Sequence, residues 1–112
     1  MQPGALDVYP PTRTGTFAVP VDHSKFVLPE RTFGIRYAAY DKFVTTSTAP
    51  VLLYCGNEGA LELFYNATGA IFEHARALGA HVFFVEHRYY GRSLPFGDKG
   101  SFTREGLQYL SI

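Results

Sequence analysis

The sequence of 112 residues has a single cysteine and no net charge, and both features exclude classes of protein. Cys55 has no partner for a disulfide within the chain. Because Cys55 lies at the end of an apolar strand, we expect its side chain to be small and buried rather than a nucleophile. Ten basic and ten acidic residues are mixed along the sequence. Because a nucleic-acid-binding protein needs a clustered basic surface, we expect no nucleic-acid partner.

Long apolar runs, a leader sequence and a metal-binding set of side chains are lacking as well. No apolar run approaches the roughly 18 residues of a membrane-spanning helix, so no membrane span is expected. Residues 1–5 have neither a basic nor an apolar leader region, so no signal peptide is visible. The chain is then expected either to be intracellular or to begin inside a longer one. Four histidines and one cysteine are scattered along the sequence, which predicts neither a metal site nor a cofactor.

The composition, 46% hydrophobic and 16% aromatic, is that of one small globular domain. Residues 1–14 are rich in proline, threonine and glycine and are predicted to form an extended lead-in, so the domain proper comprises residues 15–112. A short strand is expected over residues 16–20. Phe33, Ile35, Tyr37 and Ala39 alternate on one side of residues 32–40, which predicts a half-buried strand of an antiparallel pair.

The pattern changes after residue 50. Residues 51–54 and 82–85 are continuous apolar runs, which predict buried strands, the first covered on both faces and the second over residues 81–85. Between them a helix is expected over residues 68–78, so that strand, helix and strand form a βαβ unit with a parallel strand pair.

Capping residues define the ends of this helix. Asn66 or Thr68 is predicted to cap its start, and Gly79 is predicted to end it. A last helix is expected to begin near Ser101 or Thr103 and to run toward residue 110.

A glycine-bounded polar loop follows the first apolar strand, at Gly56-Asn57-Glu58-Gly59. Its two glycines allow a tight turn that presents backbone N–H groups, as oxyanion binding requires. Asn57 and Glu58 would add polar contacts to a substrate amine or carbonyl. The alternative is an ordinary strand-to-helix turn, because glycine and asparagine are common in such turns.

A second polar loop follows the second apolar strand, at Glu86-His87-Arg88-Tyr89-Tyr90-Gly91. A solvated loop rarely carries an acid, an imidazole, a guanidinium and two phenols in succession. These groups either line or buttress a pocket, or they include a structural ion pair between Glu86 and Arg88 that pins the loop. His87 is not assigned as a catalytic base, because no nucleophile motif accompanies it.

Several stretches together resemble the serine exopeptidase family that contains lysosomal Pro-X carboxypeptidase and dipeptidyl peptidase II. The resemblance covers residues 14–110, and its most specific part is the long string that begins at Glu86 and ends at Gly97. The matching stretches are Pro20-Val21-Asp22-His23, Thr32-Phe33-Gly34-Ile35-Arg36-Tyr37, Leu53-Tyr54-Cys55-Gly56-Asn57-Glu58-Gly59, Asn66-Ala67-Thr68-Gly69 and Glu86-His87-Arg88-Tyr89-Tyr90-Gly91-Arg92-Ser93-Leu94-Pro95-Phe96-Gly97.

The resemblance implies an α/β fold, the N-terminal part of an α/β-hydrolase fold in which antiparallel strands precede a βαβ unit. It implies a lysosomal or secreted peptidase that cleaves peptide substrates next to proline or small residues, and a candidate homodimer for the full-length protein. The loop Gly56–Gly59 would then lie near the oxyanion and the substrate terminus, and the loop Glu86–Gly91 would brace the pocket. In a secreted protein, the sequon at Asn66 makes this residue a glycosylation candidate.

The family's nucleophile motif is missing from the sequence. No serine lies in a G-x-S-x-G elbow, so the Ser-Asp-His triad and the helical insert are expected beyond Ile112, and no catalytic residue is assigned here. We expect the N-terminal fragment of a serine-type exopeptidase, truncated before the nucleophile elbow and inactive alone. The alternatives are a non-catalytic binding or regulatory module that keeps the pocket-wall loops, and an unrelated small α/β binding domain. The serines are Ser24, Ser47, Ser93, Ser101 and Ser111.

Overall fold

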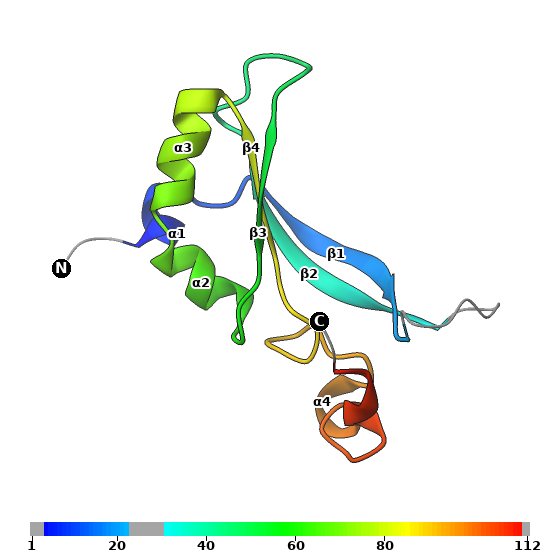
Figure 1. Cartoon of the computed structure of the whole chain (residues 1–112). Helices are drawn as coiled ribbons and strands as arrows, with labels where there is room; N and C mark the ends of the chain where they lie inside the picture. The colour runs from blue at the N-terminus through cyan, green and yellow to red at the C-terminus, as the bar shows by residue number, and fades with distance from the viewer. Residues whose placement is uncertain (1–3, 23–30, 111–112) are drawn as a thin grey trace.

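The computed structural model describes residues 4–22 and 31–110. Four strands form one mixed sheet in the order β1-β2-β4-β3 (Figure 1). Strand β2 runs antiparallel to both β1 and β4, whereas β3 and β4 are parallel. The expected α/β architecture, with antiparallel strands before a βαβ unit, is therefore present. The strands are β1 Arg13–Pro20, β2 Thr32–Tyr40, β3 Val51–Cys55 and β4 His81–Val85.

Two helices, rather than one, connect β3 to β4. They are α2 Leu61–Ala67 and α3 Ala70–Leu78. Neither Asn66 nor Thr68 caps α3 with its side chain. Instead, the Thr68 hydroxyl donates back to the carbonyl of Phe64 in α2, at 2.7 Å, and so satisfies the end of the first helix. The predicted end of α3 is confirmed, because Gly79 has a φ of 63° in the left-handed conformation that glycine adopts at helix ends.

A short helix, α1 Ala5–Val8, forms within the predicted extended lead-in. Ring stacking holds this segment against the domain, since the centroids of Tyr9 and Phe72 lie 4.6 Å apart. Ala5 is buried as a result. The lead-in therefore contributes to the core, which its proline and glycine content did not indicate.

In place of the predicted last helix, the structure has two short pieces, the first of which precedes the predicted range. They are α4 Gly97–Gly100 and the 3-10 helix η1 Gly106–Tyr109. A Cβ atom on Gly106 would overlap the carbonyl of Gly100, so the chain folds back on itself where a continuous helix would have to run straight. None of the helices in the described ranges is both long and apolar enough to cross a membrane.

Helices α1, α2 and α3 all lie on one side of the sheet (Figure 1). The even-numbered residues of β4, Val82 and Phe84, point to this side and are fully buried. The ring of Phe84 lies 4.5 Å from that of Tyr65 in α2 and 5.7 Å from that of Phe72 in α3, measured between centroids. This aromatic cluster joins both connecting helices to the centre of the sheet.

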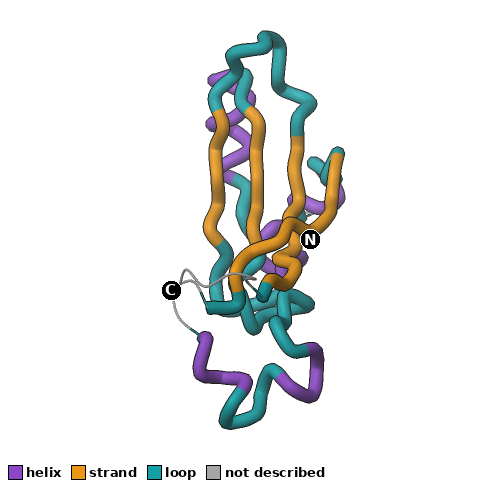
Figure 2. The backbone as a smooth tube through the Cα atoms, turned by 90° about the vertical axis from the view of Figure 1, so that its right-hand side faces the viewer, coloured by secondary structure: helices purple, strands orange, loops and turns teal. Residues whose placement is uncertain are grey.

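The opposite face of the sheet is open over β3 in the described part of the chain (Figure 2). Val51 and Leu53 are 58% and 57% exposed. The prediction that β3 is covered on both faces is therefore wrong for these residues, because both crossover helices lie on the same side. The C-terminal segment covers this second face only around Phe33 and Ile35, which pack with Phe96.

Lysine substitutions at neighbouring positions of β3 test this asymmetry. Leu53→Lys is expected to reduce self-association without lowering thermal stability, because its side chain already lies in solvent on an open edge strand. Leu52→Lys, the matched control, points to the helices and is expected to cost about 2 kcal/mol or more. Light scattering and thermal unfolding measure the two effects. Equal destabilisation by both variants would contradict the open face.

Candidate functional site

The two polar loops predicted from the sequence lie side by side at one edge of the sheet. Because β3 and β4 are parallel, with Cys55 opposite Val85, both strands deliver their loops to the same edge. Gly56 passes so close to β4 that a Cβ atom there would overlap the carbonyl of Val85 and would lie 3.0 Å from the nitrogen of His87. Glycine at position 56 is therefore required for the two loops to approach each other.

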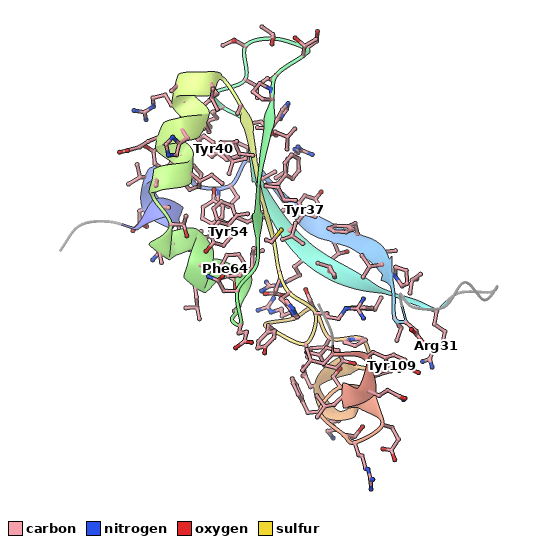
Figure 3. The ribbon with its side chains drawn as sticks, viewed as in Figure 1. Arg31, Tyr37, Tyr40, Tyr54, Phe64 and Tyr109 are labelled. Carbon is pink, nitrogen blue, oxygen red and sulfur yellow. The ribbon has the colours of Figure 1, made fainter. Side chains whose placement is uncertain are left out.

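Backbone N–H groups are available in the first loop. The N–H of Gly59 donates to the carbonyl of Asn57 at 2.8 Å, which closes a tight turn. The Asn57 side chain donates to the hydroxyl of Tyr54 at 2.9 Å, while Glu58 is exposed. The backbone N–H groups of Asn57 and Glu58 donate to no acceptor within residues 4–22 and 31–110. The turn is anchored by Tyr54, which stacks on Phe64 of α2 (Figure 3).

Glu86 is fully buried and forms an ion pair, although its partner is not the one proposed from the sequence. Its carboxylate binds Arg36 of β2 through two hydrogen bonds, from Nε at 3.0 Å and from Nη2 at 2.5 Å. The proposed pair with Arg88 is therefore wrong. The reason lies in strand alternation: residue 86 points to the helix side of the sheet, where Arg36 also points. Arg36 binds Glu62 of α2 as well, at 2.6 Å.

Three further donors complete the surroundings of the Glu86 carboxylate. The N–H of Leu61 donates at 2.7 Å, the N–H of Arg92 at 2.9 Å and the hydroxyl of Ser93 at 2.7 Å. Burial raises the pKa of Glu86, but the hydrogen bonds from Arg36 and from these three groups outweigh it and bring the pKa to about 2. Glu86 is therefore an ionised structural group and does not act as a proton donor or acceptor near neutral pH.

Arg88 braces the loop from the other face of the sheet. Its guanidinium donates to the carbonyls of Val21 at 2.7 Å, Pro20 at 2.8 Å and Tyr109 at 3.1 Å, and it lies over the ring of Phe33. Burial lowers the pKa of Arg88. These contacts tie the end of β1 and the helix η1 to the loop after β4.

The remaining residues of the second loop form its turn. Tyr89 has a φ of 73°, and its buried hydroxyl donates to the carbonyl of Gly106. Nδ1 of His87 donates to the carbonyl of Arg88 at 2.7 Å, and its ring packs edge-on against Tyr90. Gly91 has a φ of 56°, and a Cβ atom there would overlap the carboxylate of Glu86.

A hollow of about 350 Å³ lies between the two loops and the open face of the sheet. Cys55 lines it and is exposed, which corrects the expectation of a buried side chain. Only part of each loop reaches the hollow, and the side chains of Asn57, Glu58 and Tyr89 do not line it. Its lining residues are Phe17, Ile35, Leu53, Cys55, Gly56, Val85, Glu86, His87 and Arg88.

Two residues that hold the site together were not predicted from the sequence. Arg36 and Ser93 both bind Glu86, and each lay within a stretch that resembles the peptidase family without being singled out. Asn66, the glycosylation candidate, is exposed at the end of α2, where its side-chain oxygen accepts the N–H of Leu6 at 3.1 Å. Among the described residues, no group of three or more histidine, cysteine, aspartate or glutamate side chains is placed to hold a metal ion.

Comparison with known proteins gives consistent matches. The family model of serine carboxypeptidase S28 matches residues 20–112. The chain is 41% identical over 95 residues to human lysosomal Pro-X carboxypeptidase, which is 85% of this chain but 19% of the human protein. It is 39% identical over 97 residues to prolyl carboxy peptidase like protein 5 of Caenorhabditis elegans, which is 87% of this chain and 19% of the relative. It is 42% identical over 81 residues to mouse thymus-specific serine protease, or 72% and 15%. The chain thus spans between 15% and 19% of the length of these relatives.

The pKa of Glu86 predicts how stability depends on pH. Folding lowers this pKa from 4.5 to about 2, so the stability it confers is complete above pH 4.5 and is lost as the pH falls toward 2. Glu86→Gln is expected to remove a pH-dependent contribution of about 3 kcal/mol. Chemical unfolding followed between about pH 2 and pH 7 measures it. Glu62→Gln, which removes the exposed partner of the same arginine, should keep most of the dependence. Identical curves for Glu86→Gln and the wild type would refute this assignment.

Alanine substitutions at two loop glycines test the close approach to Glu86. Gly91→Ala is expected to cost about 2–4 kcal/mol, because its Cβ atom would meet the carboxylate and its φ is left-handed. Gly59→Ala, where a Cβ atom would have nothing within 4 Å, should change stability by less than about 1 kcal/mol. Thermal unfolding of both variants distinguishes them. A tolerated Gly91→Ala would mean that the loop does not rest on Glu86.

Proposed function

Because the chain belongs to the serine carboxypeptidase S28 family, we propose that it forms the N-terminal part of an α/β-hydrolase domain in a serine exopeptidase. The enzyme would remove residues next to proline or small side chains from peptide substrates. The names of the mammalian relatives point to the lysosome as its location. The activity would belong to a longer protein that contains this chain, since the chain spans about a fifth of the length of these relatives.

The observation that supports this function is the hollow at the carboxyl ends of β3 and β4. Open α/β sheets bind their ligands in the crevice outside the carboxyl ends of their strands. The hollow lies at that position, with an apolar floor of Leu53 and Val85 and with Gly56 at its rim. An apolar floor suits proline and small side chains, and the neighbouring backbone supplies hydrogen-bond donors.

In the proposed reaction, a serine attacks the scissile carbonyl, and the tetrahedral oxyanion is stabilised by preorganised N–H groups. The N–H groups of Asn57 and Glu58 fit this role, because the hydrogen bond from Gly59 to Asn57 closes their loop into a turn and they have no acceptor among the described residues. Collapse of the intermediate expels the leaving amine and leaves an acyl-enzyme, which water hydrolyses.

Neither the nucleophile nor its base is assigned to a described residue. Ser93 and Ser101 are buried, and their hydroxyls are engaged with Glu86 and with the N–H of Phe96. Nδ1 of His87 donates to the carbonyl of Arg88 within its own loop, and among the described residues no serine hydroxyl is hydrogen-bonded to this ring. The triad would come from other parts of the longer polypeptide, and residues 1–112 alone would be inactive.

A second function, as a non-catalytic binding module, is favoured by one observation. Strand β3 pairs only with β4 among the described strands, so it offers a free edge for strand addition. A stop codon directly after the codon for Ile112 in abundant transcript, together with capture of a full-length relative by residues 1–112, would favour this alternative over the peptidase.

A fluorophosphonate probe and a Pro-X peptide test the proposed function. The natural polypeptide that contains this sequence is expected to be labelled and to release the residue after proline, whereas residues 1–112 alone are not labelled. In the longer polypeptide, Gly56→Ala should lower kcat about 100-fold or more, because it displaces the oxyanion donors. Gly69→Ala, where a Cβ atom would have open space, is the matched control. Failure of the longer polypeptide to react with the probe would exclude the peptidase.

A further inference from the structure

Glu86 contacts both loops of the candidate site. On one side its carboxylate accepts the N–H of Leu61, the first residue of α2 and the second residue after Gly59. Helix α2 has no side-chain cap of its own, since its N-cap residue is Ala60. The Glu86 carboxylate therefore takes the place of the cap and fixes where the first loop enters the helix.

On the other side, the same carboxylate shapes the second loop. It accepts the N–H of Arg92 at 2.9 Å and the hydroxyl of Ser93 at 2.7 Å. The backbone of Gly91 rests directly on it. The Ser93 hydroxyl also accepts the N–H of Arg36 at 2.9 Å, so the loop is tied to β2 as well.

The guanidinium of Arg36 keeps the Glu86 carboxylate ionised although this carboxylate is buried. It pairs with Glu86 on the inside and with Glu62 of α2 on the outside, at 2.5 Å and 2.6 Å. A charge-assisted network of this kind holds its members in one geometry, since a buried charge that loses a donor has no water to replace it. Removal of any one donor to the Glu86 carboxylate should therefore alter the hydrogen bonds of the other donors.

We propose that Glu86 is a positioning residue that couples the two loops. Through Leu61, its carboxylate holds the Gly56–Gly59 loop in the geometry that presents the N–H groups of Asn57 and Glu58. Because the same carboxylate binds the loop after β4, it fixes the position of one loop relative to the other. This inference rests on the proposed function for its catalytic meaning, while the coupling itself is a property of the chain.

Amide hydrogen exchange in residues 1–112 tests the coupling. The substituted residue, Ser93, is a donor to Glu86 that does not contact the first loop. Ser93→Ala removes one hydrogen bond to Glu86, and it should speed exchange of the Leu61 amide about tenfold and shift its proton resonance. Ser101→Ala is the matched control, because it removes a buried hydroxyl that binds only locally to the N–H of Phe96. It should leave the Leu61 amide unchanged.

Two outcomes would overturn the proposal. One is an unchanged Leu61 amide in Ser93→Ala, and the other is an equal change in both variants, which would reflect only a loss of global stability. If Ser93→Ala does not fold, Ser93→Cys keeps a weaker donor at the same place and allows the same comparison, with an intermediate effect expected.

Kinetics of the longer polypeptide separate positioning from simple stability. Because oxyanion contacts develop in the transition state, Ser93→Ala should lower kcat about tenfold and change KM by less than about twofold. Because a smaller folded fraction would also lower the apparent kcat at constant KM, kcat is calculated per active site titrated with the fluorophosphonate probe. An unchanged kcat per active site would argue against positioning. Exchange in residues 1–112 does not depend on catalysis, so failure of the peptidase assay would leave the coupling intact, and failure of the exchange test would leave the peptidase intact.

Discussion

The buried ion pair between Glu86 and Arg36 is the interaction on which the arrangement of the site depends. A carboxylate without access to water costs several kcal/mol unless donors surround it. Here two bonds from the guanidinium and three from other groups meet that requirement. Each donor comes from a defined place: β2, the start of α2, or the loop after β4. Satisfying one charge thus sets the relative positions of three segments that are distant in the sequence.

A buried cation, Arg88, extends this bracing to the rest of the carboxyl edge. Arg88 donates to the carbonyls of Pro20 at the end of β1, of Val21 directly after β1, and of Tyr109 in η1. The end of β1 and the C-terminal segment are therefore held to the same loop. Alternate residues of one loop therefore anchor opposite faces of the sheet. A pocket wall held from both sides is preorganised, and an oxyanion site needs that property because its donors must be in place before charge develops.

The two faces of the sheet differ in how they are used. One carries the hydrophobic core around Phe84 and Phe72, to which α1, α2 and α3 contribute. The other is open over Val51 and Leu53 in the described part of the chain. The hollow lies on this open face, next to the loops, so the apolar surface that leaves β3 unprotected also forms the floor of the proposed binding site.

Local patterns in the sequence determined the strands, their parallel and antiparallel character, the Gly79 helix end and the position of both loops after apolar strands. These features depend on neighbouring residues, through alternation, turn preference and the length of a crossover. Tertiary contacts alone decided that Glu86 pairs with Arg36, 50 residues away, rather than with nearby Arg88. They also decided that Cys55 is exposed, that α1 docks through Tyr9, and that the connection between β3 and β4 breaks into two helices. The physical reason is that a buried charge selects whichever donors the fold brings to it, and sequence spacing does not encode that choice.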